Sequence, residues 1–301
     1  MLSKRDKLFL AAETLGSLAC PVCSAHLTRT GDDFACPNRH RLNVNRKGCL
    51  NVLSAQVDSC YDAALFAARR RVFDAGCYNA VVEAIESLLP EGTQRLLDAG
   101  CYNAVVEAIE NLLPKGNQRL LDAGCGDGWY LNALLTQHED WCGAGVDISR
   151  DAILQATNLP CTALWVVGDL RRLPFADGSF TAALDVLTPA NYDEFRRVLA
   201  PDGLLIKVYP GSGYLKELRA ARGMAPYEEG QVDAYLREKA AIVGEKRITV
   251  THAVSDDLWR DFVWMTPLMQ DLSPEEKNAI AAKNAGSVTV DLHVAACRME
   301  G

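Results

Sequence analysis

The sequence lacks any run of about 18 or more apolar residues, the length that a membrane-spanning helix needs. It also lacks an excess of positive charge, because 31 Lys and Arg residues stand against 39 Asp and Glu residues, for a net charge of −8. Proteins coated by nucleic acid are usually basic, so only local basic patches remain as candidates for such contacts. The candidate patches are Lys4-Arg5-Lys7, Arg69-Arg70-Arg71, Arg171-Arg172 and Arg196-Arg197. For each of them, a solvent-exposed face without a partner is the simpler interpretation.

A clear signal peptide is also missing, because Glu13 and Thr14 interrupt the short apolar stretch near the N-terminus. The 11 cysteines are scattered and do not frame a small disulfide scaffold, which favours a reduced, cytoplasmic chain. A length of 301 residues suits one large domain with one small one.

What is present first is a set of metal ligands in CPVCSAHLTRTGDDFACPNRH, residues 20–40. Cys20 and Cys23 form a Cys-x2-Cys pair, and Cys36 and His40 form a Cys-x3-His pair after a hairpin-like segment. Two such pairs are typical of a closed, structural zinc site, and metal would supply folding energy that so small a segment lacks. Two other residues, Cys49 and His26, could replace His40 as the fourth ligand, although their spacing is less suitable.

A glycine-rich turn follows a short apolar stretch in QRLLDAGCGDGWY, residues 118–130. A strand at Leu120-Leu121, a turn containing Gly124 and Gly126, and a helix from Trp129 would form the first unit of a doubly wound nucleotide-binding fold. Further strands are expected in GAGVDIS (143–149), LWVVGDLRRLPF (164–175), SFTAALDVL (179–187), GLLIKVYP (203–210), RITVTHAV (247–254) and SVTVDLHVAAC (287–297). Alternating strands and helices predict an α/β fold with a mostly parallel sheet.

Carboxylates at the ends of these strands are suited to a nucleoside. Asp122 ends the first strand, and Asp147 ends the second, where it could accept both ribose hydroxyls. Asp169 ends the third, where it could meet an adenine amino group. A helix cap or a loop carboxylate is the structural alternative for the first two.

The phrase DAGC occurs three times, because residues 74–97 and 98–121 are nearly identical copies. They differ only at Ser87/Asn111, Glu91/Lys115 and Thr93/Asn117, which indicates a recent tandem duplication. Each copy predicts one amphipathic helix ended by a proline. Only the third phrase continues into Gly-Asp-Gly, so only it can hold a cofactor; one copy would keep the original role and the other would be an insertion, packed nearby or partly loose.

From residue 118 onward, the Asp-x-Gly-x-Gly-x-Gly turn, Asp147 and GDLRRLPF resemble the class I S-adenosylmethionine-dependent methyltransferases. With the zinc motif, the chain resembles the bacterial 23S ribosomal RNA (guanine-N1-)methyltransferases, and its Gram-positive branch in particular. The stretches that carry this resemblance are HRLNVNRKGCLNVL (40–53), AARRRVFDAGCY (67–78), LTPANYDEF (187–195), GSGYLKELR (211–219) and WMTPL (264–268).

The resemblance implies a class I methyltransferase Rossmann-like sheet with a small N-terminal zinc-binding module, S-adenosyl-L-methionine and Zn²⁺ as cofactors, and 23S ribosomal RNA as partner. It implies cofactor contacts at Gly126, Asp127 and Tyr214, and at the tyrosine of DAGCY. Both Tyr78 and Tyr102 match that tyrosine. We favour Tyr102, whose helix leads into the first strand, although Tyr78 keeps the better upstream context. Members of the family also form homodimers.

The expected division is a zinc-binding RNA-recognition module at 1–55, a helical linker with the duplication at 56–117 and the methyltransferase domain at 118–301. A base must remove the proton from guanine N1, and Asp185 at the end of the fourth strand is the candidate. We expect the target base to leave its stack and rest on aromatic side chains, with Tyr192, Tyr209, Tyr214 and Trp264 as candidates. The alternatives are a small-molecule methyltransferase and a non-catalytic RNA-binding protein impaired by the duplication.

Overall fold

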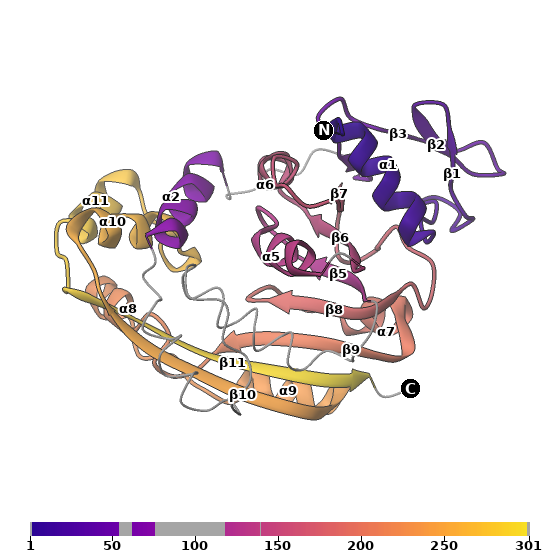
Figure 1. Cartoon of the computed structure of the whole chain (residues 1–301). Helices are drawn as coiled ribbons and strands as arrows, with labels where there is room; N and C mark the ends of the chain where they lie inside the picture. Colours follow the sequence, from indigo (N-terminus) through magenta and orange to yellow (C-terminus); the bar gives the residue numbers. More distant parts are fainter. Residues whose placement is uncertain (1, 54–61, 76–117, 139, 300–301) are drawn as a thin grey trace.

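The computed structural model describes residues 2–53, 62–75, 118–138 and 140–299, in which an eight-stranded sheet forms the centre (Figure 1). The strand order is β10-β11-β9-β8-β5-β6-β7-β4. The bounds are β4 Leu50–Asn51, β5 Arg119–Ala123, β6 Cys142–Asp147, β7 Leu164–Val167, β8 Phe180–Val186, β9 Leu199–Pro210, β10 Ala240–Ala253 and β11 Ser287–Met299. Neighbouring strands from β4 to β9 are parallel, whereas β11 runs antiparallel to both β9 and β10. The predicted α/β fold is confirmed.

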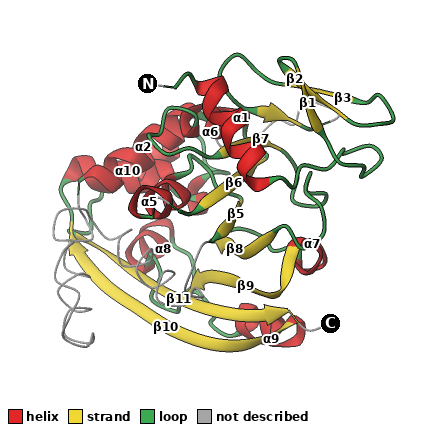
Figure 2. Cartoon of the chain, turned by 45° about the vertical axis from the view of Figure 1, so that its right-hand side comes forward, coloured by secondary structure: helices red, strands yellow, loops and turns green. Residues whose placement is uncertain are grey.

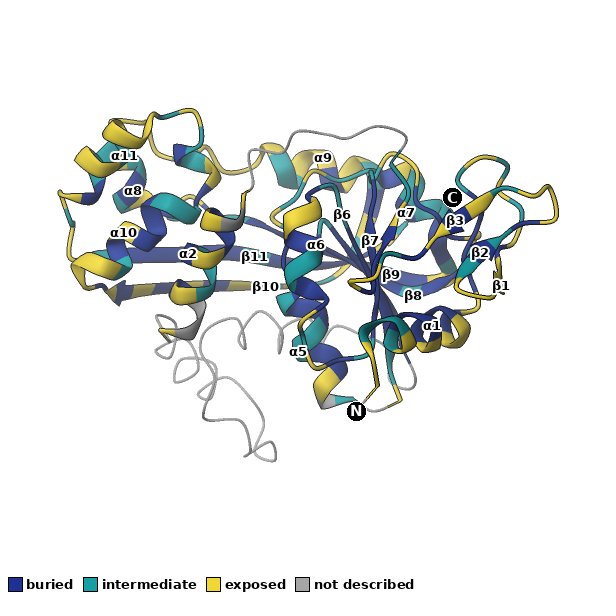
Figure 3. Cartoon of the chain, turned by 90° about the horizontal axis from the view of Figure 1, so that it is seen from above, coloured by how far each residue is buried: buried dark blue, intermediate teal, exposed yellow. Residues whose placement is uncertain are grey.

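Helices cover both faces of this sheet, as its apolar sequence requires (Figures 2 and 3). Alternate residues of one strand enter opposite cores: Leu120 packs with one apolar cluster and Leu121 with the other. The first cluster takes side chains from α5 (Trp129–Gln137), α6 (Arg150–Ala156), α8 (Lys216–Arg222), α10 (Asp256–Met265) and α11 (Pro274–Ala281). The second takes them from α1 (Lys4–Leu15), α7 (Tyr192–Val198) and α9 (Gln231–Lys239).

The N-terminal segment is joined to the central sheet. It contains α1, a small antiparallel sheet of β1 (Thr28–Thr30), β2 (Asp33–Ala35) and β3 (Arg41–Asn43), and then β4. Helix α1 packs on β6 and β7, and β4 extends the large sheet by pairing with β7, Leu50 opposite Val166. The expected module at 1–55 is thus continuous with the sheet through its last strand.

Helix α2 (Ala63–Asp74) lies beside α10, at the end of the molecule opposite the small sheet (Figure 1). A short 3-10 helix, η1 (Pro267–Met269), follows α10. Within the described ranges no helix is both long and apolar enough to cross a membrane. Most of the duplicated stretch, residues 76–117 with Tyr78 and Tyr102, lies outside the described residues.

Candidate functional site: a cofactor cavity and a metal cluster

The glycine-rich turn connects β5 to α5 in backbone conformations that favour glycine. Gly124 and Gly126 have φ angles of 73° and 55°. Space is also limited there, because a Cβ atom at Gly124 would lie 2.5 Å from Oγ1 of Thr188, and one at Gly126 would lie 2.8 Å from Nη1 of Arg69. The turn therefore brings bare backbone to the carboxyl ends of the parallel strands, where doubly wound folds bind ligands.

A cavity of about 480 Å³ opens at this edge of the sheet. Its walls come from the glycine turn, the ends of β6, β7 and β8, helix α2 and the segment after α10. The polar lining includes Arg69, Gly124, Gly126, Asp147, Asp169, Arg171, Asn191 and Tyr214, and the apolar lining includes Phe66, Val186, Leu187, Pro189, Met265 and Pro267.

Two of the predicted carboxylates line the cavity. Asp147 Oδ2 accepts a hydrogen bond from the Gly126 amide at 2.8 Å, and its Oδ1 accepts one from the Ser149 amide at 2.7 Å. Burial raises the pKa of Asp147. Asp169 accepts hydrogen bonds from the Arg171 backbone and guanidinium at 2.6 to 2.8 Å, and these bonds lower its pKa.

The other two carboxylates lie beneath the turn. Asp122 is buried, and its Oδ2 has no hydrogen-bond partner among the described residues. Burial raises the pKa of Asp122 to about 7. Asp127 is fully buried, and its Oδ2 accepts a hydrogen bond from Arg70 at 2.9 Å. Neither is among the cavity-lining residues.

Tyr214 reaches the cavity from a loop that follows β9 and is anchored to the neighbouring strand β11. The Gly213 amide donates to Asp291 Oδ2 at 2.8 Å. Asp291 in β11 also accepts from Arg247 at 2.8 and 2.9 Å and from Thr249 at 2.7 Å. Burial would raise the pKa of Asp291, but these bonds outweigh it and hold the value at about 2. A carboxylate that is ionised at neutral pH therefore fixes the backbone next to Tyr214.

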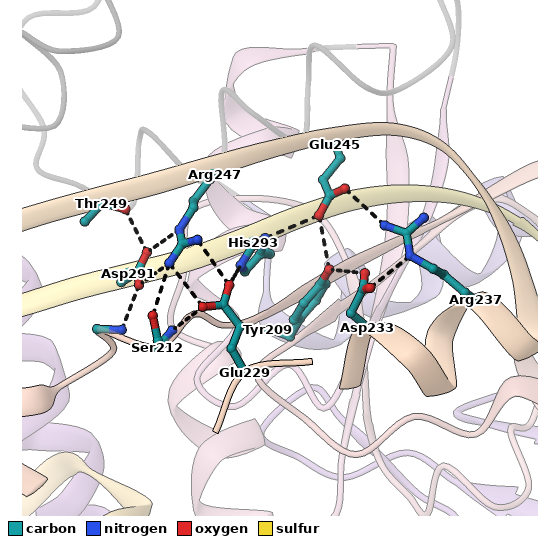
Figure 4. A network of polar contacts seen from close by, with 11 residues as sticks. Tyr209, Ser212, Glu229, Asp233, Arg237, Glu245, Arg247, Thr249, Asp291 and His293 are labelled. Atoms are coloured by element: carbon teal, nitrogen blue, oxygen red, sulfur yellow. Dashed lines mark hydrogen bonds and ion pairs between the residues drawn. The ribbon is translucent and has the colours of Figure 1, made fainter. Parts of the chain in front are cut away.

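The anchoring network continues along β9, β10 and β11 (Figure 4). Glu229 contacts Arg247 at 3.1 Å and Nε2 of His293 at 2.6 Å. His293 stacks on Tyr209, with ring centroids 5.0 Å apart, and the Tyr209 hydroxyl lies 3.1 Å from Asp233 and 3.2 Å from Glu245.

At the end of β8, Asp185 forms a buried ion pair with Lys207, whose Nζ lies 2.9 Å from Oδ2. The same ammonium donates to the carbonyl of Thr188 in the cavity wall at 2.7 Å. Burial raises the pKa of Asp185 to about 6, although Lys207 acts in the opposite direction. Asp185 is fully buried and is not among the cavity-lining residues, whereas its neighbour Val186 is.

Of the four aromatic candidates for the target base, Tyr214 alone lines the cavity described here. Tyr192 and Tyr209 are buried, and the ring of Trp264 faces the ammonium of Lys277 at 5.2 Å. Sequence reasoning also missed part of the site: the wall supplied by α2, through Phe66 and Arg69, and the wall after α10. The sequence shows the run Arg69-Arg70-Arg71, but its simpler interpretation as a solvated face does not predict that Arg69 lines the cavity.

The predicted zinc ligands form one cluster. The ligand atoms of Cys20, Cys23, Cys36 and His40 all lie within 4.8 Å of one another. The Cys23 and Cys36 sulfurs are 3.7 Å apart, and Nδ1 of His40 lies 3.6 Å from the Cys20 sulfur and 3.4 Å from the Cys36 sulfur. Ligands around a tetrahedral zinc ion, with Zn–S near 2.3 Å, are separated by about 3.6 to 3.8 Å.

These four side chains therefore fit a closed zinc site, and His40 is the fourth ligand in the cluster. Of the two alternatives, Cys49 is buried in the apolar cluster of α5 and α6, and His26 lies in a separate hollow beside α1. Hydrogen bonding, chiefly from Asn38, lowers the pKa of Cys23 to about 6, the direction that favours a metal-binding thiolate.

The cavity likewise fits a cationic nucleoside cofactor. Asp122, buried outside the cavity lining, keeps one oxygen without a hydrogen-bond partner among the described residues. The lining itself combines the backbone of the glycine turn, the carboxylates of Asp147 and Asp169 and the guanidinium groups of Arg69 and Arg171 around a largely apolar space. Such a surface suits ribose hydroxyls, an adenine amino group and positive charge.

Comparison with known proteins agrees with both sites. The family described as "Methyltransferase domain" matches residues 120–203, and the zinc ribbon family described as "RlmA, N-terminal" matches residues 18–59. The 23S rRNA (guanine(748)-N(1))-methyltransferase of Streptomyces fradiae is 30% identical over 288 residues, covering 93% of this chain and 96% of that protein.

The YxjB protein of Bacillus subtilis, provisionally named for methylation of guanine N1 in 23S rRNA, is 29% identical over 285 residues, covering 91% of this chain and 94% of that protein. A solved methyltransferase from Geobacter sulfurreducens, in complex with S-adenosyl-L-homocysteine, superposes with a TM-score of 0.44 at 14% identity, covering 66% of this chain and 90% of that one. At that level the superposition carries no functional argument.

Proposed function

Because this chain belongs to the family of 23S ribosomal RNA (guanine-N1-)methyltransferases, we propose that it methylates N1 of one guanine in 23S ribosomal RNA, using S-adenosyl-L-methionine. One chain, similar to such an enzyme along nearly its whole length, contains both a cavity with lining carboxylates at a glycine-rich turn and a zinc-type cluster, and this observation carries the proposal.

When bound, S-adenosyl-L-methionine supplies an electrophilic methyl group on its sulfonium. In this proposal the chain mainly aligns donor and acceptor. Asp147 would accept hydrogen bonds from the ribose hydroxyls, and Asp169 would accept one from the adenine amino group. The backbone at Gly124 and Gly126 and the side chain of Tyr214 would contact the rest of the cofactor, and Asp122 and Asp127 would support the turn from within the protein. Tyr102 is part of the same proposal, although it lies outside the described residues.

Removal of the guanine N1 proton remains assigned to Asp185, as a prediction. In its favour, burial keeps its pKa near 6, which suits a base at neutral pH. Against it, the carboxylate faces Lys207 and is fully buried. To remove the proton, Asp185 must therefore become accessible to the target guanine when RNA binds.

Substitution of Asp185 tests this role. If Asp185 is the base, Asp185→Asn should slow single-turnover methyl transfer by about 100-fold or more while cofactor affinity stays within about threefold. The rate of the wild type should fall below about pH 6, following the pKa of Asp185. An unchanged rate, or a loss of rate matched by a loss of folding, would remove Asp185 from the mechanism.

The N-terminal segment is proposed to recognise the RNA, with the zinc cluster holding β1, β2 and β3 together. The functional boundaries at 1–55, 56–117 and 118–301 are part of this proposal. The proposed substrate places the enzyme in the cytoplasm. A homodimer is also proposed, by family resemblance, and sedimentation of the zinc-loaded chain would test it.

Transfer of labelled methyl groups to RNA tests the proposal against its alternatives. Purified chain, labelled S-adenosyl-L-methionine and unmodified 23S RNA transcript should give label in RNA that is lost after nuclease treatment. Label in small molecules without RNA would favour a small-molecule methyltransferase. RNA binding without any transfer would favour a non-catalytic protein.

A further inference from the structure

Helix α2 presents three consecutive arginines to three different surroundings. Successive residues of an α-helix point about 100° apart, so neighbouring side chains cannot share one partner on one face. Arg69, Arg70 and Arg71 follow this rule. Each has an acidic neighbour of its own. Arg69 acts on Asp147 in the cavity lining, Arg70 pairs with Asp127 of the glycine turn, and Arg71 pairs with Asp261 on α10.

Arg71 ties α2 to α10. Its Nε lies 3.1 and 2.9 Å from the two carboxylate oxygens of Asp261, and its Nη2 lies 2.7 Å from Oδ1. This two-pronged geometry fixes direction as well as distance. Val72 and Phe66 are buried on the same helix, so apolar packing holds it in the same place.

Arg70 ties α2 to the glycine turn. Its Nη2 lies 2.9 Å from Oδ2 of Asp127, which is fully buried. A buried carboxylate needs such a partner, because an unpaired charge there would be costly. Two arginine–carboxylate pairs therefore hold the helix, one to the glycine turn and one to α10.

Arg69 then points into the cavity, as one of its lining residues. Its guanidinium passes over the turn, close enough that a Cβ atom at Gly126 would lie 2.8 Å from Nη1. Its positive charge also acts on Asp122 and Asp147, lowering the pKa of each against the larger effect of burial.

The proposed cofactor carries one negative group, the carboxylate of its methionyl part, together with an ammonium and a sulfonium. Among the described residues, the cationic side chains that line the cavity are Arg69 and Arg171. Arg171 lies at the rim, 87% exposed, and is bound to Asp169 at the proposed adenine end. If Asp147 and Asp169 hold the nucleoside, Arg69 beside the glycine turn is the lining cation left for the methionyl end.

We infer that Arg69 binds the carboxylate of the cofactor's methionyl group, and that Arg70 and Arg71 position the helix that carries it. This inference rests on the proposed function. It also assigns the arginine run to the cofactor in preference to RNA phosphates, because Arg70 and Arg71 are already bound to Asp127 and Asp261.

Calorimetry on the zinc-loaded full chain tests the inference with two probes: S-adenosyl-L-methionine and its decarboxylated analogue, which keeps both positive charges. The wild type should bind the intact cofactor about 10- to 100-fold more tightly, as expected for hydrogen bonds between charged groups. Arg69→Gln should bind both probes alike, near the affinity of the wild type for the analogue. Arg69→Lys should recover part of the difference.

The control is Arg260→Gln, which removes an exposed arginine of α10 that pairs with Asp257 at 3.4 Å; it should behave as the wild type. Melting temperature and zinc content identify a variant that fails to fold, and Arg69→Lys then decides the question. Equal weakening of both probes by Arg69→Gln, or no weakening, would overturn the role of Arg69 while leaving the proposed function intact. A wild type that binds neither probe would remove the proposed function, and the inference with it.

Discussion

Asp122 shows how the burial of a single carboxyl group affects stability. Its pKa of about 7 lies above the ordinary value of 3.8 because the carboxyl is buried. The folded protein therefore holds this proton more tightly than the unfolded chain between those two pH values. The ionised form lowers stability progressively as pH rises through that window.

Replacing Asp122 should remove this cost. We expect the stability of Asp122→Asn, relative to the wild type without cofactor, to increase between pH 5 and pH 7 by on the order of 2 kcal/mol, since one pKa unit corresponds to about 1.4 kcal/mol. Urea unfolding at both pH values measures this, with exposed Asp257→Asn as the control. If the difference in unfolding free energy between Asp122→Asn and the wild type is the same at pH 5 and pH 7, the pKa of Asp122 is not raised.

Single residues were predictable where the chemistry shows in local spacing. The four zinc ligands form two close pairs, and they meet in the structure. Gly126, Asp147 and Asp169 follow strand ends, and all three line the cavity. Arg69 was not predictable, since a helical residue 57 positions before Gly126 gives no local sign that it faces the glycine turn.

At the scale of elements, the loop before Tyr214 depends on β11. Asp291→Asn should lose the charge that holds Arg247 and the Gly213 amide. We expect unfolding free energy at pH 7 to fall by about 2 to 3 kcal/mol, and cofactor affinity to fall several-fold as the loop loosens. Urea unfolding and calorimetry measure these two effects.

The stability that Asp291 contributes should depend on pH. The pKa of Asp291 in the folded state, about 2, lies below the ordinary 3.8, so its stabilisation is complete above about pH 4 and is lost as pH falls toward 2. The difference in unfolding free energy between the wild type and Asp291→Asn should therefore be smaller at pH 3 than at pH 7. Asp233→Asn, at the other end of the network, should lower stability without changing cofactor affinity.

Most strands were predictable because buried parallel strands are short apolar runs between turns. A different pattern marks the antiparallel end of the sheet, where apolar and polar residues alternate in ITVTH of β10 and VTVDLHV of β11. Strand β4 was not predicted, because two residues carry no periodic signal and its place is set by pairing with β7. The position of α1 on β6 and β7 was not predicted either, because it is set by packing between segments that are far apart in the sequence.

At the scale of the whole molecule, the metal cluster and the cavity are separate sites. Among described residues, the cavity lining begins at Leu65, after the zinc-type cluster and β4. Removing zinc with a chelator, or by Cys36→Ser, should lower the melting temperature and abolish RNA methylation, yet leave cofactor affinity within about threefold. Zinc analysis with calorimetry checks this, and loss of both functions together would contradict it.

The duplication gives a second prediction at this scale. Deleting residues 74–97 leaves Phe73 followed by DAGCY from the second copy, so the sequence entering and leaving α2 is kept. We expect cofactor affinity equal to that of the full chain within about threefold. Binding only after the deletion would mean that the first copy obstructs the cavity.

The most direct test of the account is the chemical identity of the modified base. 23S RNA methylated by the full chain should be digested for nucleoside mass spectrometry and mapped by reverse transcription, which stops where N1 is blocked. The account predicts 1-methylguanosine and one cofactor-dependent stop, with the position matching guanine 748 of the Streptomyces relative's name examined first. A methyl group on another atom, or no methylated nucleoside despite cofactor binding, would contradict it.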